Sequence, residues 1–312
     1  MNALALRSPR HLRHGFTIVE LLVTLAIVAI LLALLLPAVM SATETARRVS
    51  CLQQLKQFGL AEQNFEASHN KMPPGAALQA MQPNSAIKLD GNGIFFLWPY
   101  MEGDTLWDQC LSGDLRSPFN NGVYKVPMMQ FICPSDNTHE SNMVRVNDQG
   151  LWAASSYAGN GLLFCQVERN ALGSYEFKGV ERGQTVSVAA TDGVSQTIMF
   201  TEKVARCDPP ASTGWASGGN ARDNAEMNVN IPMFLGSIGL PLGGERGVGP
   251  GSMFKVQVSN KNCNADNASS CHSVLNVVFA SGSGRGLSPS IDKKLWWSLL
   301  TPNESDLTSE DF

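Results

Sequence analysis

A long apolar segment from Phe16 to Met40 limits what this chain can fold into more than any other feature of its sequence. Within it only Thr17, Glu20 and Thr24 are polar. Since a helix rises about 1.5 Å per residue, a segment of this length is ample for a ~30 Å hydrocarbon layer. The sequence therefore predicts a membrane-spanning helix over residues 16–40.

The residues before this segment carry only positive charge. Arg7, Arg10 and Arg13 lie there, with no acidic residue among them. Because positively charged flanks stay cytoplasmic, we expect a cytoplasmic N-terminus and a C-terminal region outside the inner membrane. A secretory signal would end in a cleavage site of small residues, and none follows this apolar segment. A simple uncleaved single-pass anchor is one alternative.

Glu20 argues against the simple anchor. An ionisable residue in a spanning helix costs about 2.5–3.5 kcal/mol at the bilayer centre and less near the interface. A cut before Phe16 would create an α-amino group, and Glu20 lies one helical turn further along. That amine, or the amine of an adjacent subunit, would give the carboxylate a positively charged partner.

The segment 13–22, RHGFTIVELL, resembles the N-terminal processing signal of type IV prepilins and type II secretion pseudopilins. The resemblance implies that prepilin peptidase cleaves after Gly15 and that the new N-terminal residue, Phe16, is methylated. It also implies that Glu20 neutralises the amine of a neighbouring pilin or pseudopilin subunit during assembly. Pro37 matches a proline that kinks or locally melts this helix within filaments.

After Pro37 the helical pattern continues to about residue 70, where two prolines and a glycine follow. One stripe of this continuation is apolar at helical spacing, although Glu62 intrudes on it. We expect the stripe to pack against the chain's own domain, and the alternative is packing between neighbouring subunits. The stripe consists of Cys51, Leu55, Phe58 and Phe65.

The remaining chain alternates short apolar runs with turn residues, which predicts an α+β fold: a long N-terminal helix packed on an antiparallel sheet. We expect a leader at 1–15, the spanning segment at 16–40, an amphipathic continuation at 41–70 and an extracytoplasmic globular domain at 71–312. Strands are expected at 94–97, 128–132, 186–188, 197–200 and 274–279, and short helices at 106–111 and 293–300.

Three further segments, 51–57, 131–136 and 191–198, together with the prolines at 73–74, resemble a large bacterial prepilin-like family. It is catalogued as domain-of-unknown-function family 1559 and sometimes labelled as related to solute-binding proteins. That family usually carries a histidine, about nine residues, and then Asp-Gly near its C-terminus. Here His272 is followed by a shorter spacer and Ser281-Gly282, so the aspartate is missing. The family has no established biochemical activity.

The seven cysteines form no C-x-x-C pair, so the spacing of zinc and thioredoxin-type sites is absent. In an exported domain we expect Cys263 and Cys271 to form a disulfide, and the odd total leaves at least one thiol over. A calcium loop is an alternative for this region, although the glycine and the last glutamate of an EF-hand are missing. The candidate calcium ligands are Asn260, Asn262, Asn264 and Asp266.

The composition excludes several classes of function. The net charge is −4 and no basic patch is present, which excludes nucleic-acid binding. Neither H-E-x-x-H, G-x-S-x-G nor a Walker loop occurs, so we expect no enzyme, no cofactor and no metal site. His69, His139 and His272 are interpreted as surface or capping residues.

These observations favour a structural subunit, anchored in the inner membrane and assembled with other subunits into a pilus or type II secretion pseudopilus. A membrane-tethered binding module for a solute or polysaccharide is the alternative, with tryptophans as the stacking surface for a sugar. The tryptophans are Trp98, Trp107, Trp152, Trp215, Trp296 and Trp297.

Overall fold

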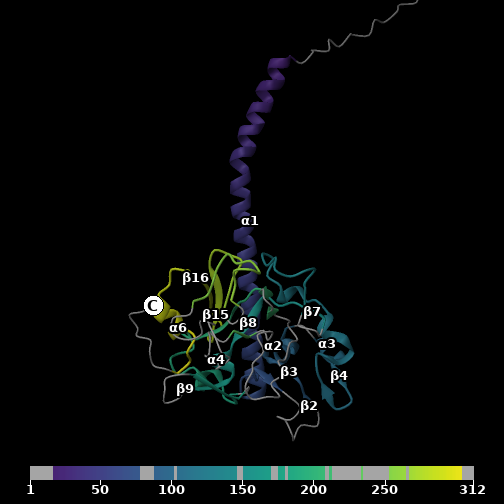
Figure 1. The fold of residues 1–312 in the computed structure, drawn as a ribbon, viewed down its shortest axis with the longest axis vertical. Helices are drawn as coiled ribbons and strands as arrows, with labels where there is room; N and C mark the ends of the chain where they lie inside the picture. The colour runs from purple at the N-terminus through teal and green to yellow at the C-terminus, as the bar shows by residue number, and fades with distance from the viewer. Residues whose placement is uncertain are drawn as a thin grey trace, which may run out of the picture. The chain divides into compact units, whose positions relative to one another are not determined.

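The computed structural model describes residues 17–77, 88–101, 104–145, 150–169, 175–179, 182–207, 211–212, 233–234, 253–264 and 267–303. Its internal contacts divide the chain into two units, Met1–Ala46 and Arg47–Phe312. Figure 1 shows the long helix α1 and the strands and short helices of the second unit.

Helix α1, Ile18–His69, confirms the long helix expected from the sequence. Its large apolar side chains between Ile18 and Met40 are exposed. Among the described residues, α1 is the helix whose length and composition suit a membrane span. The helix is continuous through Pro37. Because proline has no backbone N–H, the Ala33 carbonyl receives no helical hydrogen bond from position 37.

The later part of α1 supplies a buried stripe to the core of the second unit. The ring of Phe58 lies 5.4 Å from Phe131, 5.7 Å from Tyr157 and 5.6 Å from Phe200, measured between centroids. The stripe therefore packs against the chain's own domain, as expected. All of its members are buried: Cys51, Leu55, Phe58, Glu62 and Phe65.

Gly59 allows α1 to pack closely against the main sheet. A Cβ added at Gly59 would lie 2.9 Å from Cγ1 of Val278, so only a residue without a side chain lets the helix approach that strand. The helix ends at His69, and Asn70 follows with φ of 54°. The Asn70 N–H donates to the Glu66 carbonyl at 2.7 Å, which is the usual left-handed helix termination.

The main sheet has five strands in the order β14-β8-β11-β15-β16. Neighbours are antiparallel except for β14, which runs parallel to β8. Two of these strands, β11 and β15, confirm strands expected from the sequence. The strands are β14 (Met233–Phe234), β8 (Tyr157–Asn160), β11 (Ile198–Glu202), β15 (Leu275–Phe279) and β16 (Gly284–Leu287).

Several small sheets surround the main one (Figure 1). They pair β1 (Ala76–Ala77) with β3 (Gly91–Asn92), β6 (Met143–Arg145) with β7 (Leu151–Ala153), β9 (Gln166–Arg169) with β10 (Tyr175–Gly179), and β12 (Arg206–Cys207) with β13 (Ala211–Ser212). A further sheet has the order β2 (Lys88–Leu89), β5 (Leu115–Arg116), β4 (Leu111–Ser112).

Three of the expected strands are wrong, because each forms a helical turn. The run at 94–97 lies in α2, Gly93–Leu97, where the Asn92 side chain accepts a hydrogen bond from the Phe95 N–H at 3.0 Å. The run at 128–132 contains a 3₁₀ turn, Met129–Phe131, and the run at 186–188 lies in α5, Val186–Ala189. Fully buried short runs have no polar alternation, so periodicity does not separate strand from helix.

The short helices expected at 106–111 and 293–300 are confirmed as α3 (Asp104–Gln109) and α6 (Lys293–Ser298). Asp292 caps α6 by accepting hydrogen bonds from the Lys294 and Leu295 amides. The remaining helices are α4 (Gly161–Phe164) and the 3₁₀ segments η2 (Trp98–Tyr100) and η3 (Asn120–Lys125).

Candidate functional site

The part of the N-terminal signal that the structure describes begins at Thr17. Its backbone N–H and its hydroxyl both donate to Oε2 of Glu20 at 2.9 Å, and the Glu20 N–H donates back to the Thr17 hydroxyl at 3.2 Å. This reciprocal pair is a capping box at the start of α1. Gly15 and Phe16, the expected cleavage and methylation residues, lie outside the described residues.

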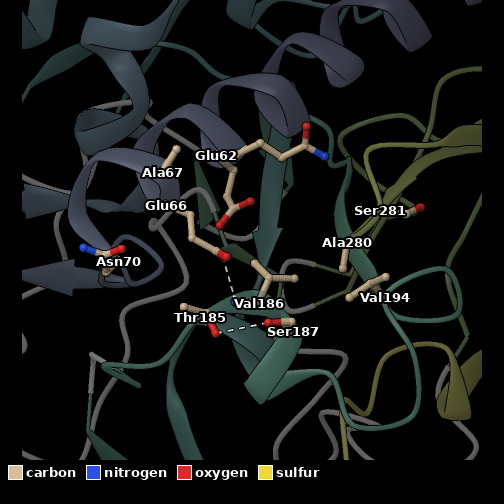
Figure 2. Close-up of a pocket in the computed structure, with 11 residues that line it drawn as sticks. Glu62, Glu66, Ala67, Asn70, Thr185, Val186, Ser187, Val194, Ala280 and Ser281 are labelled. Atoms are coloured by element: carbon tan, nitrogen blue, oxygen red, sulfur yellow. Dashed lines mark hydrogen bonds between the residues drawn. The ribbon is translucent and has the colours of Figure 1, made fainter.

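A second candidate site is a groove of about 460 Å³ in the second unit (Figure 2). Four segments form its walls: the last turns of α1, the start of α5, Val194 in the turn before β11, and the turn between β15 and β16. Because these segments are far apart in the sequence, no single sequence motif predicts the groove. Residues that line it include Glu62, Glu66, Asn70, Val186, Ser187 and Ser281.

Glu62 is the unusual residue of this groove. It is 1% exposed, and among the described residues its Oε1 has no hydrogen-bond partner. Burial, and secondarily the nearby Glu66 carboxylate, raises the pKa of Glu62 to about 8. Glu66 is held in place differently, since its Oε2 accepts a hydrogen bond from the Val186 N–H at 2.7 Å. The groove therefore holds a buried carboxyl group that favours its protonated form at neutral pH.

Ser281 also lines the groove. Its hydroxyl lies 2.9 Å from the Ser283 hydroxyl, and its N–H donates to the Val194 carbonyl at 2.8 Å.

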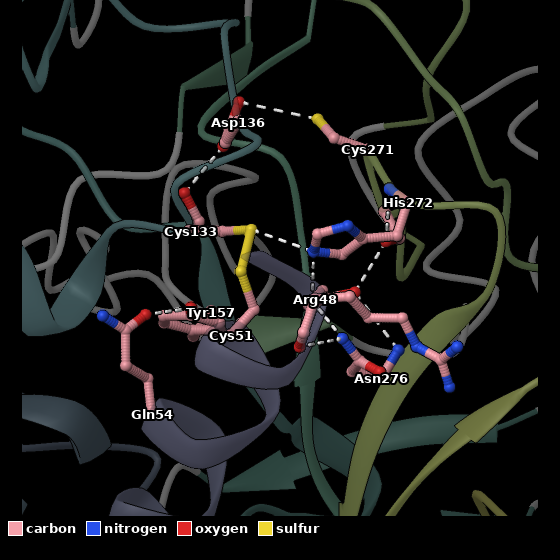
Figure 3. The surroundings of a disulfide bond; sticks show 12 residues. Arg48, Cys51, Gln54, Cys133, Asp136, Tyr157, Cys271, His272 and Asn276 are labelled. Atoms are coloured by element: carbon pink, nitrogen blue, oxygen red, sulfur yellow. Dashed lines mark hydrogen bonds and ion pairs between the residues drawn. A yellow bond between two sulfur atoms is a disulfide. The ribbon is translucent and has the colours of Figure 1, made fainter. Parts of the chain in front are cut away.

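The third candidate site surrounds the disulfide between Cys51 and Cys133 (Figure 3). The two sulfurs, an imidazole nitrogen of His272 and a carboxylate oxygen of Glu202 all lie within 4.8 Å of one another, and all four residues are buried. The Nε2 atom of His272 lies 3.3 Å from Sγ of Cys133 and 3.4 Å from Oε1 of Glu202. The interpretation of His272 as a surface or capping residue is therefore wrong.

Other polar groups hold Glu202 in position. Oε2 accepts hydrogen bonds from the Ser270 hydroxyl at 2.6 Å and from the Asn276 N–H at 3.1 Å, while Oε1 accepts one from Asn276 Nδ2 at 2.8 Å. Burial raises the pKa of Glu202, and the neighbouring His272 partly opposes this. Glu202 is not predictable as a site residue from the sequence, where it is only a charged residue at the end of an apolar run.

The expected disulfide between Cys263 and Cys271 is wrong, because Cys263 pairs with Cys207 at a Cα–Cα distance of 5.7 Å. Sγ of Cys263 also lies 3.9 Å from the carbonyl of Arg206, the residue before Cys207. Cys271 instead directs its sulfur toward Oδ1 of Asp136, at 3.9 Å. The candidate calcium ligand Asp266 lies outside the described residues.

Asp136 organises the loop that carries Cys133. Its carboxylate accepts hydrogen bonds from the Thr138 hydroxyl at 2.7 Å, the Ser156 hydroxyl at 2.7 Å and the Ala205 N–H at 2.9 Å. The loop is thereby joined to the start of β8 and to the segment after β11, which fixes the position of Cys133 against α1.

The tryptophans in the described part of the chain do not form the sugar-stacking surface of the alternative function. Four of them are buried in the core, and Trp107 is half-buried with its ring 4.7 Å from that of Phe95. Trp215 lies outside the described residues. The buried tryptophans are Trp98, Trp152, Trp296 and Trp297.

A family match covers residues 40–294 of the chain and has the description "Protein of unknown function (DUF1559)". The chain belongs to the DUF1559 family. The matched part of this DUF1559 protein includes the buried half of α1, the groove and the cluster around the first disulfide. Comparisons with curated proteins and with solved structures give no match.

A second match, to the prokaryotic N-terminal methylation motif, covers residues 10–36. This motif and the exposed apolar part of α1 make the DUF1559 protein a type IV pilin-like, membrane-anchored protein. Neither matched description names an enzymatic activity.

Proposed function

We propose that this DUF1559 protein is a prepilin-like structural subunit, cut by prepilin peptidase after Gly15 and methylated on the new N-terminal residue, Phe16. Residues 16–40 then span the inner membrane once, and the domain at 71–312 lies on the extracytoplasmic side. Glu20 neutralises the amine of a neighbouring subunit, and the subunits assemble into a pilus or a type II secretion pseudopilus.

The observation that carries this proposal is the capping box between Thr17 and Glu20 at the start of an exposed apolar helix. The Glu20 carboxylate already lies at a backbone amide one residue from Phe16. An amine created by cleavage before Phe16 would therefore arise close to a carboxylate in a medium of low dielectric constant, where opposite charges attract strongly. The same carboxylate can turn to the amine of an adjacent subunit.

Pro37 supports the filament part of the proposal. The unbonded Ala33 carbonyl weakens α1 inside its apolar half, so bending or local melting costs least there. A subunit that must fit between neighbours in a fibre would use such a point to adjust its helix.

N-terminal mass spectrometry of the protein purified from native membranes tests processing. We expect a mature chain that begins with N-methylphenylalanine at Phe16. A chain that still begins at Met1 would overturn the proposal. Gly15→Ala serves as the processing variant, and we expect it to accumulate in the unprocessed form.

We also propose a second function, the capture of a solute with an ammonium group in the groove. The observation that favours it is the buried Oε1 of Glu62, which has no hydrogen-bond partner among the described residues and faces a groove of about 460 Å³. Burying a carboxylate is costly unless a cation or donor pairs with it. A ligand ammonium group would supply that pairing, with Glu66 beside it.

Thermal unfolding of the detergent-solubilised full chain tests this capture function. Glucosamine and glucose make a matched pair, because they differ by an amine in place of a hydroxyl. We expect glucosamine alone to raise the unfolding temperature, and Glu62→Gln to abolish the effect. Equal shifts with both sugars, or no shift with either, would exclude ammonium capture in this groove.

A further inference from the structure

We propose that Cys51, Cys133, His272 and Glu202 form a zinc-type metal site when the Cys51–Cys133 disulfide is reduced. The four side chains supply two sulfurs, one imidazole nitrogen and one carboxylate oxygen, which are the ligand types that zinc takes in proteins. This inference rests on the geometry of the cluster and goes beyond the proposed role in a filament.

The distances agree with a tetrahedral arrangement of ligands. With bond lengths of about 2.3 Å to sulfur and about 2.0–2.1 Å to nitrogen and oxygen, neighbouring ligand atoms are separated by about 3.4–3.6 Å. The Nε2 atom of His272 lies 3.3 Å from Cys133 Sγ and 3.4 Å from Glu202 Oε1. Two edges of the tetrahedron therefore already have the required length.

The edge between the two sulfurs is the one that must change. In a tetrahedral site two thiolates stand about 3.8 Å apart, so the bonded sulfurs have to separate. The Cα atoms of Cys51 and Cys133 are 5.3 Å apart, which leaves room for this by side-chain rotation. Cys51 lies on α1 and Cys133 on a separate loop, so the two sulfurs belong to different elements of the fold.

The disulfide and the metal are alternative states of the same sulfurs. A phosphine reductant breaks the S–S bond with two electrons, takes up the oxygen of a water molecule and leaves two protons on the thiols. A divalent ion then binds both sulfurs and displaces those two protons, because the thiolate is the form that binds metal. In an oxidising compartment the disulfide prevails, and in a reducing one the dithiol is available to the metal.

Hydrogen bonds from neighbouring residues hold Glu202 and the backbone of His272 in position. The Ser270 hydroxyl and the Asn276 amide groups orient Glu202, and the backbone N–H of His272 donates to the Ser270 hydroxyl at 3.0 Å, which fixes the main chain that carries the imidazole. Outer contacts of this kind fix metal ligands in position. Two thiolates and one carboxylate around a divalent ion leave one net negative charge, which the donors from Ser270 and Asn276 disperse.

The test uses the detergent-solubilised full chain, reduced with a phosphine and titrated with Co²⁺ as the spectroscopic probe for zinc. We expect about one Co²⁺ per reduced chain, with thiolate-to-cobalt charge-transfer absorption and the visible bands of a tetrahedral ion. The oxidised chain is expected to show neither. Addition of Zn²⁺ should remove both signals by displacing the cobalt.

Two double variants form a matched pair, since each removes one disulfide. Cys51→Ser/Cys133→Ser is expected to lose the cobalt signals, and Cys207→Ser/Cys263→Ser to keep them. In case the first variant fails to fold, His272→Asn and Glu202→Gln keep both disulfides, so folding is checked by circular dichroism before reduction. Each is expected to weaken Co²⁺ binding at least tenfold.

Three results would overturn the proposal. The reduced wild-type chain could show no cobalt signals. The signals could persist unchanged in His272→Asn and in Cys51→Ser/Cys133→Ser. They could disappear in Cys207→Ser/Cys263→Ser alone, which would place the ion at the second disulfide.

Discussion

The N–H and the hydroxyl of Thr17 both donate to Oε2 of Glu20, each at 2.9 Å. Glu20 therefore has a local structural role, the capping of its own helix, beside the assembly role proposed for its charge. The two roles depend on different properties of the side chain. A cap needs an acceptor oxygen, whereas neutralisation of an amine needs a negative charge.

Glu20→Gln separates these roles. Glutamine keeps the acceptor oxygen, so the capping box stays intact and peptidase cleavage is expected to proceed normally. The charge is lost, and we expect assembly to fall at least tenfold, measured as the yield of sheared filaments or cross-linked oligomers. Glu20→Ala, which removes both properties, should assemble no better than Glu20→Gln.

Thr17→Val is the control for the cap alone, because it removes the hydroxyl and keeps the charge of Glu20. We expect a small loss of helix stability, about 0.5–2 kcal/mol, with assembly retained. Normal assembly in Glu20→Gln would show that assembly does not need the charge of Glu20.

Phe58→Ala is expected to destabilise the second unit by about 3–5 kcal/mol, because the ring contacts Phe131, Tyr157 and Phe200 in the core. The free energy of unfolding, measured by urea titration in detergent, checks this. Leu60→Ala is the matched control on the same helix, since Leu60 is 58% exposed. Similar losses from the two changes would contradict this assignment of the core.

Gly59→Ala should cost about 1–3 kcal/mol through overpacking, since the new Cβ would lie 2.9 Å from Cγ1 of Val278. Val278→Ala removes that atom, and we expect it to relieve part of the cost in the double variant. A double-mutant cycle on unfolding free energies measures the coupling. Strict additivity of the two changes would show that α1 does not approach β15 this closely.

Glu62→Gln is expected to change how stability depends on pH. The folded chain keeps a proton on Glu62 up to about pH 8, whereas the unfolded chain loses it near its ordinary value of 4.5. In this window the unfolded state binds fewer protons, so wild-type stability falls as pH rises. Glutamine removes this dependence, and the variant should be about 4 kcal/mol more stable at pH 8 and nearly equal at pH 4. Parallel stability curves, measured by thermal unfolding, would mean that Glu62 ionises normally.

Peptide mapping without reduction should recover the pairs Cys51–Cys133 and Cys207–Cys263. Cys110 and Cys165 are expected to react with an alkylating agent only after unfolding. Both are buried, and burial raises the pKa of each thiol to about 12, so the reactive thiolate is scarce. A peptide linking Cys263 to Cys271 would restore the sequence-based pairing.

The sequence predicted those parts of the fold whose pattern is local. The apolar segment and the stripe through Leu55 and Phe58 predicted α1, because helical periodicity is carried by neighbouring residues. The strand expected at 197–200 is also confirmed, as β11 at Ile198–Glu202. The segment 94–97 was wrongly predicted as a strand, because a fully apolar run shows no alternation of polar and apolar residues. The helix that forms there begins at the Asn92 cap, which lies outside this run.

The candidate sites were predicted less well, since they depend on residues that are distant in the sequence. The N-terminal signal is contiguous and could be read directly. The cluster around His272 joins four residues from α1, a loop, β11 and the segment before β15. The Cys207–Cys263 pair depends on where β12 lies, so the shorter loop to Cys271 was the wrong choice.

Helix α1 has two roles. It provides the exposed apolar segment that begins at Ile18, and it also provides Phe58, which is buried in the core of the second unit. If the second unit is extracytoplasmic, as proposed, a protease can release it intact only by a cut before Arg47, where that unit begins. A cut after His69 would remove Phe58 and Cys51. The aromatic rings that pack against Phe58 would then be exposed to water. Such a fragment would aggregate, so we expect any released form found in a culture medium to retain residues 47–69 of α1.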